Sequence, residues 1–307
     1  MADVIDNGRT KSKLPSQLIS PTAFGTVVSA AVNCKQPFNI PTNTTLNEKY
    51  DVLAVESVGM KHGKDFSLGY YGIGIGGSRS VGADTNGLEG RKVYQHKATD
   101  QAAFYPIPFL IRDLDNGNDI DPAIRENYRM RVVRKIGEIT YVMYYLKKIG
   151  FQLFDPSVKI GTRDETTGNE TEYPYEYKKE DLSPTPYELL TTDSIPLSNT
   201  YANGTGKLDL SLNSSDLNEI RNVCTILFND VTKAAINEMY LVHGIETTFD
   251  GQIGSGGTVN YKELLSAVSS FTITEAWARD ANANSTMPWY FHIGNSLPML
   301  VAQDALV

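Results

Sequence analysis

The amino-acid sequence predicts an α+β fold that is mainly β, with an antiparallel sheet or sandwich as its core, a few helices and long ordered loops. The first observation is the stretch from Asn127 to Phe154, where apolar residues alternate with basic ones and then, after Gly137, give way to a run rich in Tyr, Val, Ile and Met. Short runs of β-branched and aromatic residues also recur between turn residues along the whole chain, a pattern typical of strands. One long segment, near residues 215–231, has the spacing of an amphipathic helix.

We interpret residues 127–154 as a β-hairpin. Its first strand should expose one basic face to solvent, and its second strand, apolar on both faces, should be central in the sheet. A helix is the competing interpretation, because Ile136, Ile139, Met143 and Leu146 lie three and four residues apart. The β-branched and aromatic content and the internal glycine favour the hairpin.

Four regions are expected along the chain: an N-terminal arm (1–22), a β-rich core domain (23–160), an extended loop or linker (161–210) and an α+β C-terminal part packing on the core (211–307). The arm is polar and lacks an apolar face. We therefore expect it to be disordered in the isolated protein and ordered only against a neighbouring subunit. The region from 161, rich in acids and tyrosines, is long for a loop, which indicates a functional segment or a linker.

Turn residues separate the individual elements. Strands are predicted at 25–32, 50–58, 65–75, 93–96, 236–245, 271–278 and 289–293. Glycine-rich loops are predicted at 78–90 and 250–258, a short helix at 261–268, and one helical turn after Pro122. Residues 104–111 carry two prolines and should form an edge strand or an extended segment. The long helix should be capped by Ser215 or Asp216, with Glu219 completing a capping box.

Composition and charge exclude several classes of protein. The 307 residues include 28 Lys+Arg against 36 Asp+Glu, a net charge of −8, so general binding of nucleic acid, which requires a basic surface, is not expected. No apolar run approaches the length that spans a bilayer, and the polar start differs from a signal peptide, which predicts synthesis and assembly in the cytosol. Cys34 and Cys224 should be buried small hydrophobic residues in that reducing compartment.

Gly72, Gly74 and Gly77 fit the pattern G-x-G-x-x-G after a predicted strand. A dinucleotide site also needs a helix to begin there, so that its amide groups face the pyrophosphate. The polar, glycine-rich residues that follow cannot form that helix. We interpret these glycines as positions where another backbone approaches closely.

A second pattern resembles a calcium-binding loop, because four carboxylates lie in one turn. An EF-hand has Gly at its sixth position and a bidentate Glu at its twelfth. Counting from the first aspartate, this chain has Gly117 at the fifth and Ile124 at the twelfth. We therefore expect an Asn-Gly turn with solvated carboxylates and no tight calcium site. The four weak metal candidates are Asp113, Asp115, Asp119 and Asp121.

The sequence predicts no enzyme and no cofactor. Its histidines have neither a histidine four residues away nor a cysteine pair nearby, so zinc is not predicted. Patterns of nucleophile elbows, P-loops and kinases are absent from the sequence. A carboxylate pair for glycoside hydrolysis can come from any part of a fold, so that chemistry stays open. The histidines are His62, His96, His243 and His292.

Basic residues gather around the predicted hairpin. They form either a solvated strand face that protects an edge, or a contact surface for an acidic neighbour, such as residues 164–181 of another copy. The second interpretation gives a set of interaction residues in the hairpin, the acidic region and the arm. They are Arg129, Arg131, Lys135, Glu172, Tyr175, Glu176, Arg9, Lys11 and Lys13.

The chain resembles structural proteins of tailed-phage virions. The resemblance rests on the MADV start, loops rich in Thr, Asn and Gly, few Cys and His, many Tyr, and the order of YPIPF, an RDLDN turn and an Arg-rich strand between about His96 and Lys148. Baseplate, tail or neck proteins match better than capsid shell proteins. The resemblance implies a subunit in the virion, assembled in the host cytoplasm, whose partners are other virion proteins or copies of itself, with no membrane and no direct nucleic-acid contact.

Two other classes stay open from the sequence. A carbohydrate-active or receptor-binding protein could use Trp277 and Trp289 as sugar platforms, together with paired carboxylates of perturbed pKa in a cleft. A calcium-dependent adhesion module depends on residues 113–121.

Overall fold

The computed structural model describes residues 5–6, 9–10, 17–38, 40–52, 66–83, 89–117, 119–164, 167, 169–183, 199–253, 257–282 and 285–298. The chain forms two compact units: the first unit is Met1–Ile149 with Leu212–Met287, and the second unit is Gly150–Ser211 with Pro288–Val307. The four predicted regions are therefore regrouped. Most of the expected C-terminal part belongs with the expected core, and its last residues join the expected linker.

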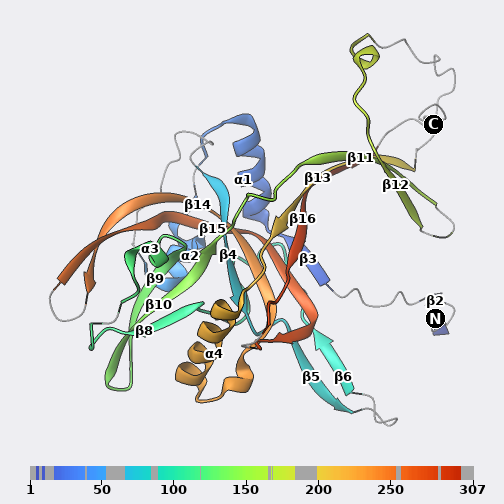
Figure 1. Cartoon of the computed structure of the whole chain (residues 1–307). Helices are drawn as coiled ribbons and strands as arrows, with labels where there is room; N and C mark the ends of the chain where they lie inside the picture. The colour runs from blue at the N-terminus through green and yellow to red at the C-terminus, as the bar shows by residue number, and fades with distance from the viewer. Residues whose placement is uncertain are drawn as a thin grey trace. The chain divides into compact units, whose positions relative to one another are not determined.

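The first unit is built on an eight-stranded antiparallel sheet. Its strands follow the order β3-β15-β14-β4-β10-β8, with β7 paired to β4 and β9 paired to β10. β14 and β15 run side by side as long curved strands (Figure 1). The mainly β, antiparallel fold predicted from the sequence is confirmed. The strand bounds are Gln17–Pro21 (β3), Ser67–Gly74 (β4), Pro106–Ile107 (β7), Leu110–Asp113 (β8), Tyr128–Ile136 (β9), Ile139–Lys148 (β10), Ala235–Ile253 (β14) and Gly257–Asp280 (β15).

The hairpin predicted at 127–154 is present as β9 and β10, which pair from Ile139↔Ile136 to Lys147↔Tyr128. Gly137 turns the chain with a φ of 61°, a backbone conformation that glycine adopts without steric cost. The strand predicted at 65–75 is β4, and those at 236–245 and 271–278 lie within β14 and β15.

The helix predicted at 261–268 is wrong, because these residues belong to strand β15 and pair with β14. The ladder shifts register between Leu241 and Val242 and between Ile245 and Glu246. Each such bulge breaks the simple alternation of a strand and lets apolar residues fall at helix-like spacings. The loop predicted at 250–258 is likewise the end of this hairpin, of which residues 254–256 lie outside the described part.

Part of the expected N-terminal arm belongs to the sheet. β3 pairs with β15 from Phe271↔Pro21 to Glu275↔Gln17, while Ile5–Asp6 (β1) and Arg9–Thr10 (β2) form a separate two-stranded pair. Strand β3 was not predicted because its sequence has no apolar face. An edge strand is held by backbone hydrogen bonds, which do not require one. Lys11, Lys13 and the other residues of 1–16 outside β1 and β2 are not described.

The strand predicted at 25–32 is instead helix α1 (Ala23–Cys34). Thr22 caps it by accepting a hydrogen bond from the Gly25 amide at 2.9 Å, and Lys35 ends it in the left-handed region. Helix α2 (Leu46–Tyr50) is capped in the same way by Thr45 and ends where a strand was predicted at 50–58. Residues 53–58 lie outside the described part. These threonine caps were the sequence signal for both helices.

Helix α4 (Ser214–Phe228) confirms the long helix, but its cap is Asn213, which forms a capping box with Asp216. Glu219, predicted to complete that box, instead binds Arg112 of β8 through two hydrogen bonds of 2.6 Å. The predicted turn after Pro122 is helix α3 (Pro122–Arg125).

The loop predicted at 78–90 is a second hairpin, formed by β5 (Ser78–Ala83) and β6 (Glu89–Val93). Residues 84–88 between them are outside the described part. The strand predicted at 93–96 is therefore only the end of β6. The extended character of residues 104–111 is confirmed, since β7 and the start of β8 fall there.

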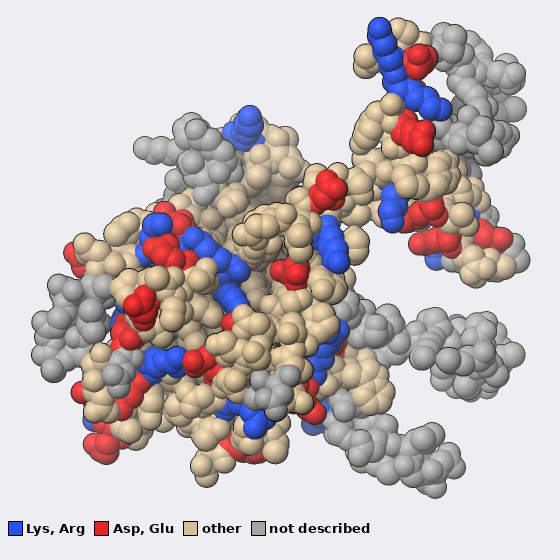
Figure 2. Space-filling view, viewed as in Figure 1, with Lys and Arg blue, Asp and Glu red and all other residues tan. Residues whose placement is uncertain are grey.

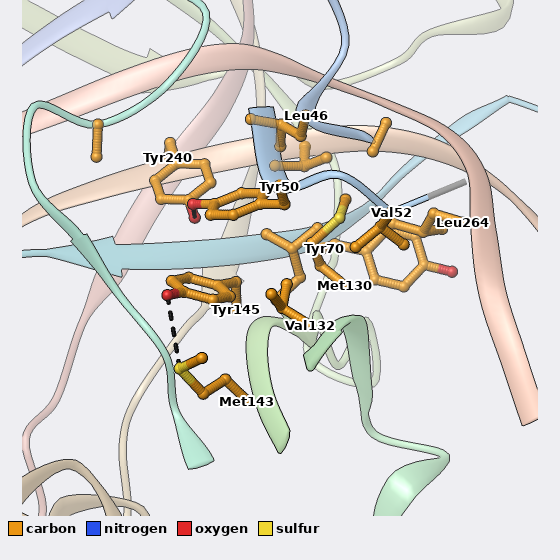
Figure 3. Packing of buried hydrophobic residues seen from close by; sticks show 14 of the residues in the cluster. Leu46, Tyr50, Val52, Tyr70, Met130, Val132, Met143, Tyr145, Tyr240 and Leu264 are labelled. Atoms are coloured by element: carbon orange, nitrogen blue, oxygen red, sulfur yellow. Dashed lines mark hydrogen bonds between the residues drawn. The ribbon is translucent and has the colours of Figure 1, made fainter. Parts of the chain in front are cut away.

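The main core of the first unit is formed by α2, α4 and the strands β4, β8, β9, β10, β14 and β15. Tyr50 stacks on Tyr145 with 4.3 Å between ring centroids, and its hydroxyl meets that of Tyr240 at 3.3 Å (Figure 3). A smaller cluster around Phe66 packs beneath α1. Cys224 is buried as predicted, but Cys34 at the end of α1 is exposed, which corrects the prediction for that residue.

The second unit holds a four-stranded antiparallel sheet of order β12-β11-β13-β16. A sheet therefore replaces most of the predicted linker, and residues 184–198 of that region are not described. The strand predicted at 289–293 corresponds to β16. In the described part of the whole chain, every helix is too short or too polar to cross a membrane. The bounds are Ser157–Arg163 (β11), Glu170–Pro174 (β12), Thr200–Asp209 (β13) and Tyr290–Pro298 (β16).

Candidate interaction sites

The basic face of the hairpin, predicted to be wet, is largely buried. Arg129 is 1% exposed and donates to Glu246 of β14 at 2.6 Å. Burial acts against the charge of Glu246, but hydrogen bonds from Tyr70 and Lys148 and the charge of Arg129 outweigh it and lower the pKa of Glu246 to about 2. Arg129 is thus a structural residue of the first unit, and its prediction as an intermolecular contact is wrong.

Arg131 is buried in the same way, because its guanidinium donates to Asp119 at 3.0 Å. Lys147 contacts both carboxylate oxygens of Asp216 at 2.6 Å. The acidic partners that the sequence assigned to a neighbouring subunit are supplied by the chain itself, and most positive side chains on the face seen in Figure 2 lie beside negative ones. Lys135 alone of the three predicted hairpin residues is exposed, with a distant partner in Glu138 at 3.7 Å.

The carboxylates of the predicted acidic turn each serve the local fold. Asp113 accepts hydrogen bonds from the amides of residues 115 and 116, and Asp115 accepts one from the amide of Thr140. Asp121 caps α3, and Asp119 binds Arg131 and the hydroxyl of Tyr144. The described residues contain no group of three or more His, Cys, Asp or Glu arranged to hold a metal ion.

Glu172 lies on β12 at the edge of the second unit's sheet. It accepts hydrogen bonds from Asn203 at 3.0 Å and Tyr201 at 3.1 Å, and it pairs with Lys159 at 3.3 Å. The bond from Asn203 contributes most to lowering the pKa of this carboxyl. Gly161 makes room for the ring of Tyr201, because a Cβ there would lie 2.3 Å from it.

The other two predicted residues of this unit follow β12. Tyr175 donates to Asp181 at 2.6 Å, which closes residues 175–181 into a compact turn, and the same bond lowers the pKa of Asp181. Glu176 lines a shallow pocket beside Tyr175. Tyr177, packed edge-on against Tyr175 at 5.1 Å, is nevertheless 77% exposed. Tyr175 and Glu176 therefore line one pocket, whereas Glu172 lies on the other face of the sheet with Lys159, Tyr201 and Asn203.

The glycine pattern marks a close approach of backbones, as the sequence predicted. A Cβ on Gly74 would lie 2.9 Å from the carbonyl of Tyr105, and one on Gly77 would lie 2.6 Å from the carbonyl of Asn237. At Gly72 the obstacle is the ring of Tyr240, at 2.0 Å. The chain after β4 continues into β5 and forms no helix.

These glycines surround a site that the sequence did not predict. The carboxylate of Glu238, which is 0% exposed, accepts hydrogen bonds from the amides of Gly76 at 2.9 Å, Phe104 at 2.9 Å and Tyr105 at 3.2 Å. It also contacts Nε2 of His96 at 3.0 Å. A buried carboxylate is stable only where hydrogen bonds replace its water, and here they fix the loop that contains residues 103–105.

The side chains of Phe104 and Tyr105 are exposed, although their backbone amides are bound by the buried Glu238. The ring of Phe104 stacks on His96, with centroids 3.9 Å apart and planes 7° from parallel, and meets Tyr94 edge-on at 6.1 Å. Tyr105 lies 5.8 Å from Phe228 of α4. We call Tyr94, Phe104 and Tyr105 the aromatic platform; their exposed fractions are 37%, 46% and 51%.

The remaining histidines and tryptophans have separate positions. His243 is buried beside Ser270 and Phe66, and desolvation lowers its pKa to about 4. His292 is exposed on β16, and His62 is outside the described residues. Trp289 is 1% exposed, which removes it from any sugar-binding surface, whereas Trp277 is 62% exposed.

Fold and sites together define a two-unit, mainly antiparallel β protein in which buried polar networks hold loops that expose aromatic side chains. The chain belongs to a family of unknown function, DUF7208, whose model matches residues 8–306. No curated protein and no solved structure matches it.

Proposed function

We propose that the chain is a structural subunit of a tailed-phage virion, of tail, baseplate or neck type. It works by non-covalent assembly with other virion proteins or with copies of itself, and it catalyses no reaction. The virion assignment comes from the sequence resemblance. The structure supports the more general part of this proposal, which is that the chain assembles with partners.

One observation supports assembly: the described part of the second unit exposes about as many large hydrophobic side chains as it buries. Leu153, Tyr177 and Leu182 are 66%, 77% and 83% exposed. So large an exposed share of the apolar side chains of a small unit supports a surface that binds a partner. Full burial of one such side chain against a partner stabilises a complex by about 1.5–3 kcal/mol. The exposed set is Phe151, Leu153, Tyr173, Tyr177, Leu182 and Tyr290, and the buried set is Ile160, Leu208, Leu210, Trp289 and Phe291.

The test is mass spectrometry of particles purified by density gradient from a culture that produces the protein. We expect the chain in the particle fraction, at a fixed ratio to the other particle proteins across independent preparations. A chain found only in the soluble fraction, or at a ratio that falls with each purification step, would exclude a structural role in the particle.

A further inference from the structure

The aromatic platform is held in place by hydrogen bonds and ring contacts within the chain. Glu238 holds the amides of Phe104 and Tyr105, and Gly76 leaves the space for this approach, because a Cβ there would lie 2.8 Å from the amide nitrogen of Tyr105. His96, held by Glu238 and by Asp100 at 3.2 Å, supports the ring of Phe104 from beneath. Side chains fixed in this way lose little conformational entropy when a partner covers them.

Three positive side chains lie near the platform, on a chain whose net charge is −8. Arg79 of β5 lies opposite Lys92 of β6, and the guanidinium of Arg79 is 5.9 Å from the ring of Tyr94. Residues directly opposite each other in a hairpin share a face, so the side chain of Lys92 lies on the same face as that of Arg79. Lys97 is exposed next to His96. A partner for this surface should therefore present aromatic or aliphatic side chains among carboxylates.

The second unit carries such a surface. We call residues 170–182, from Glu170 of β12 to Leu182, the acidic segment. Tyr177 and Leu182 are its most exposed apolar side chains, and Glu176 and Glu180 are exposed beside them. The segment has five carboxylates against two cations, Lys178 and Lys179, so its net charge is negative. The bond between Tyr175 and Asp181 fixes the turn, so these side chains also have a defined arrangement.

We propose that the aromatic platform of one copy of the chain binds the acidic segment of another copy. This inference rests on the proposed assembly function and names the contact that would join successive subunits. Such a contact uses two different surfaces, so it repeats from copy to copy and generates a ring or a filament.

A sugar chain fits the platform less well than the acidic segment does. Consecutive sugar rings stack on aromatic rings that are nearly coplanar, whereas Tyr94 and Phe104 meet at 71° and Tyr105 and Phe228 at 50°. Rings in these orientations form the pockets and edges into which protein side chains pack.

The experiment measures self-association of the full chain by sedimentation velocity at low salt. Lys92→Glu with Lys97→Glu should weaken it at least tenfold, and Glu176→Lys with Glu180→Lys should do the same. An equimolar mixture of the two double variants should recover part of the loss, because the reversed charges match each other. The matched control reverses two exposed cations of β9 outside the platform, Arg134 and Lys135, and should associate like the wild type.

A labelled peptide with the sequence of residues 170–182 provides a second readout through fluorescence anisotropy. It should bind the full chain, and Phe104→Ala should weaken that binding at least tenfold, while a scrambled peptide should not bind. Wild-type association in both double variants, loss confined to the Arg134 and Lys135 control, or an absence of both self-association and peptide binding would each overturn the proposal. So would binding of an acidic oligosaccharide that is lost in Phe104→Ala while self-association is kept.

This test can fail separately from the proposed function. A chain present in purified particles whose two double variants assemble normally refutes the contact and keeps the structural role. A contact confirmed in solution for a chain absent from particles refutes the structural role and keeps the contact.

Discussion

Replacing Glu238 by Gln tests whether a buried carboxylate holds the aromatic platform. One carboxylate oxygen accepts from the amides of Gly76 and Tyr105, and the other from the amide of Phe104 and from His96. Whichever way the Gln amide is turned, its NH₂ group faces at least one buried N–H. The unsatisfied donor costs about 1–3 kcal/mol of stability. The contribution of each remaining hydrogen bond falls from about 1.5–3 kcal/mol towards about 1 kcal/mol, because the acceptor is no longer charged.

The combined loss should be about 3 kcal/mol in the free energy of unfolding, measured by urea denaturation of Glu238→Gln against the wild type. Glu138→Gln is the matched control, because the Glu138 side chain is 98% exposed; its change should stay within about 0.5 kcal/mol. Amide exchange of residues 104 and 105 should accelerate in Glu238→Gln at the same time. A loss below about 1 kcal/mol, with unchanged exchange of these amides, would show that the carboxylate does not hold the loop.

Three further perturbations follow from the described contacts. Arg131→Glu should destabilise the chain by about 3–5 kcal/mol, because it leaves the buried carboxylate of Asp119 unpaired. Lys135→Glu, at an exposed position, should have little effect, and equal melting temperatures of the two variants would contradict this reasoning. Burial lowers the pKa of His243 to about 4, so the unfolded chain takes up the proton first as pH falls below about 6.5. Stability should then be full above that pH and decrease by about 3 kcal/mol down to pH 4, and His243→Gln should flatten that part of the stability curve. Gly72→Ala should cost about 1–3 kcal/mol in denaturant unfolding, since the added methyl would overlap the ring of Tyr240, and an unchanged midpoint would refute that packing.

The sequence predicted elements whose signals are local. The hairpin at 127–154 shows alternation, a glycine turn and an apolar second strand within one stretch, and α4 shows a helical stripe. Segments whose partners lie far away were misassigned. Residues 261–268 look helical in isolation, but pairing with β14 across a bulge makes them a strand, and the valines of α1 look like a strand until Thr22 caps a helix.

The site residues also divide into those with local sequence signals and those whose partners are distant in the sequence. Residues 164–181, which overlap the acidic segment, could be singled out because their tyrosines and acids are close together in the sequence. The burial of Arg129 and Arg131 could not be predicted, because Glu246 follows Arg129 by 117 residues and nothing local marks it as a partner. Glu238 likewise reaches loop amides 133 and 134 residues before it. The glycines from Gly72 to Gly77 were the only sequence signal of the Glu238 site. They indicated that another part of the chain approaches closely, but not which part.

The order of strands in the main sheet has a consequence for synthesis of the chain on the ribosome. β4 lies next to β14, and the hydrogen-bonded residues Gly76 and Glu238 are 162 positions apart. One edge of β4 therefore stays unpaired while more than half of the chain is synthesised. At about 5–20 residues per second, that wait lasts roughly 8–32 s. Unpaired strand edges attract other chains during such an interval. The yield of folded protein should therefore rise when nascent chains are kept apart, by slower initiation or by chaperones that cover the β4 edge until the β14–β15 hairpin emerges.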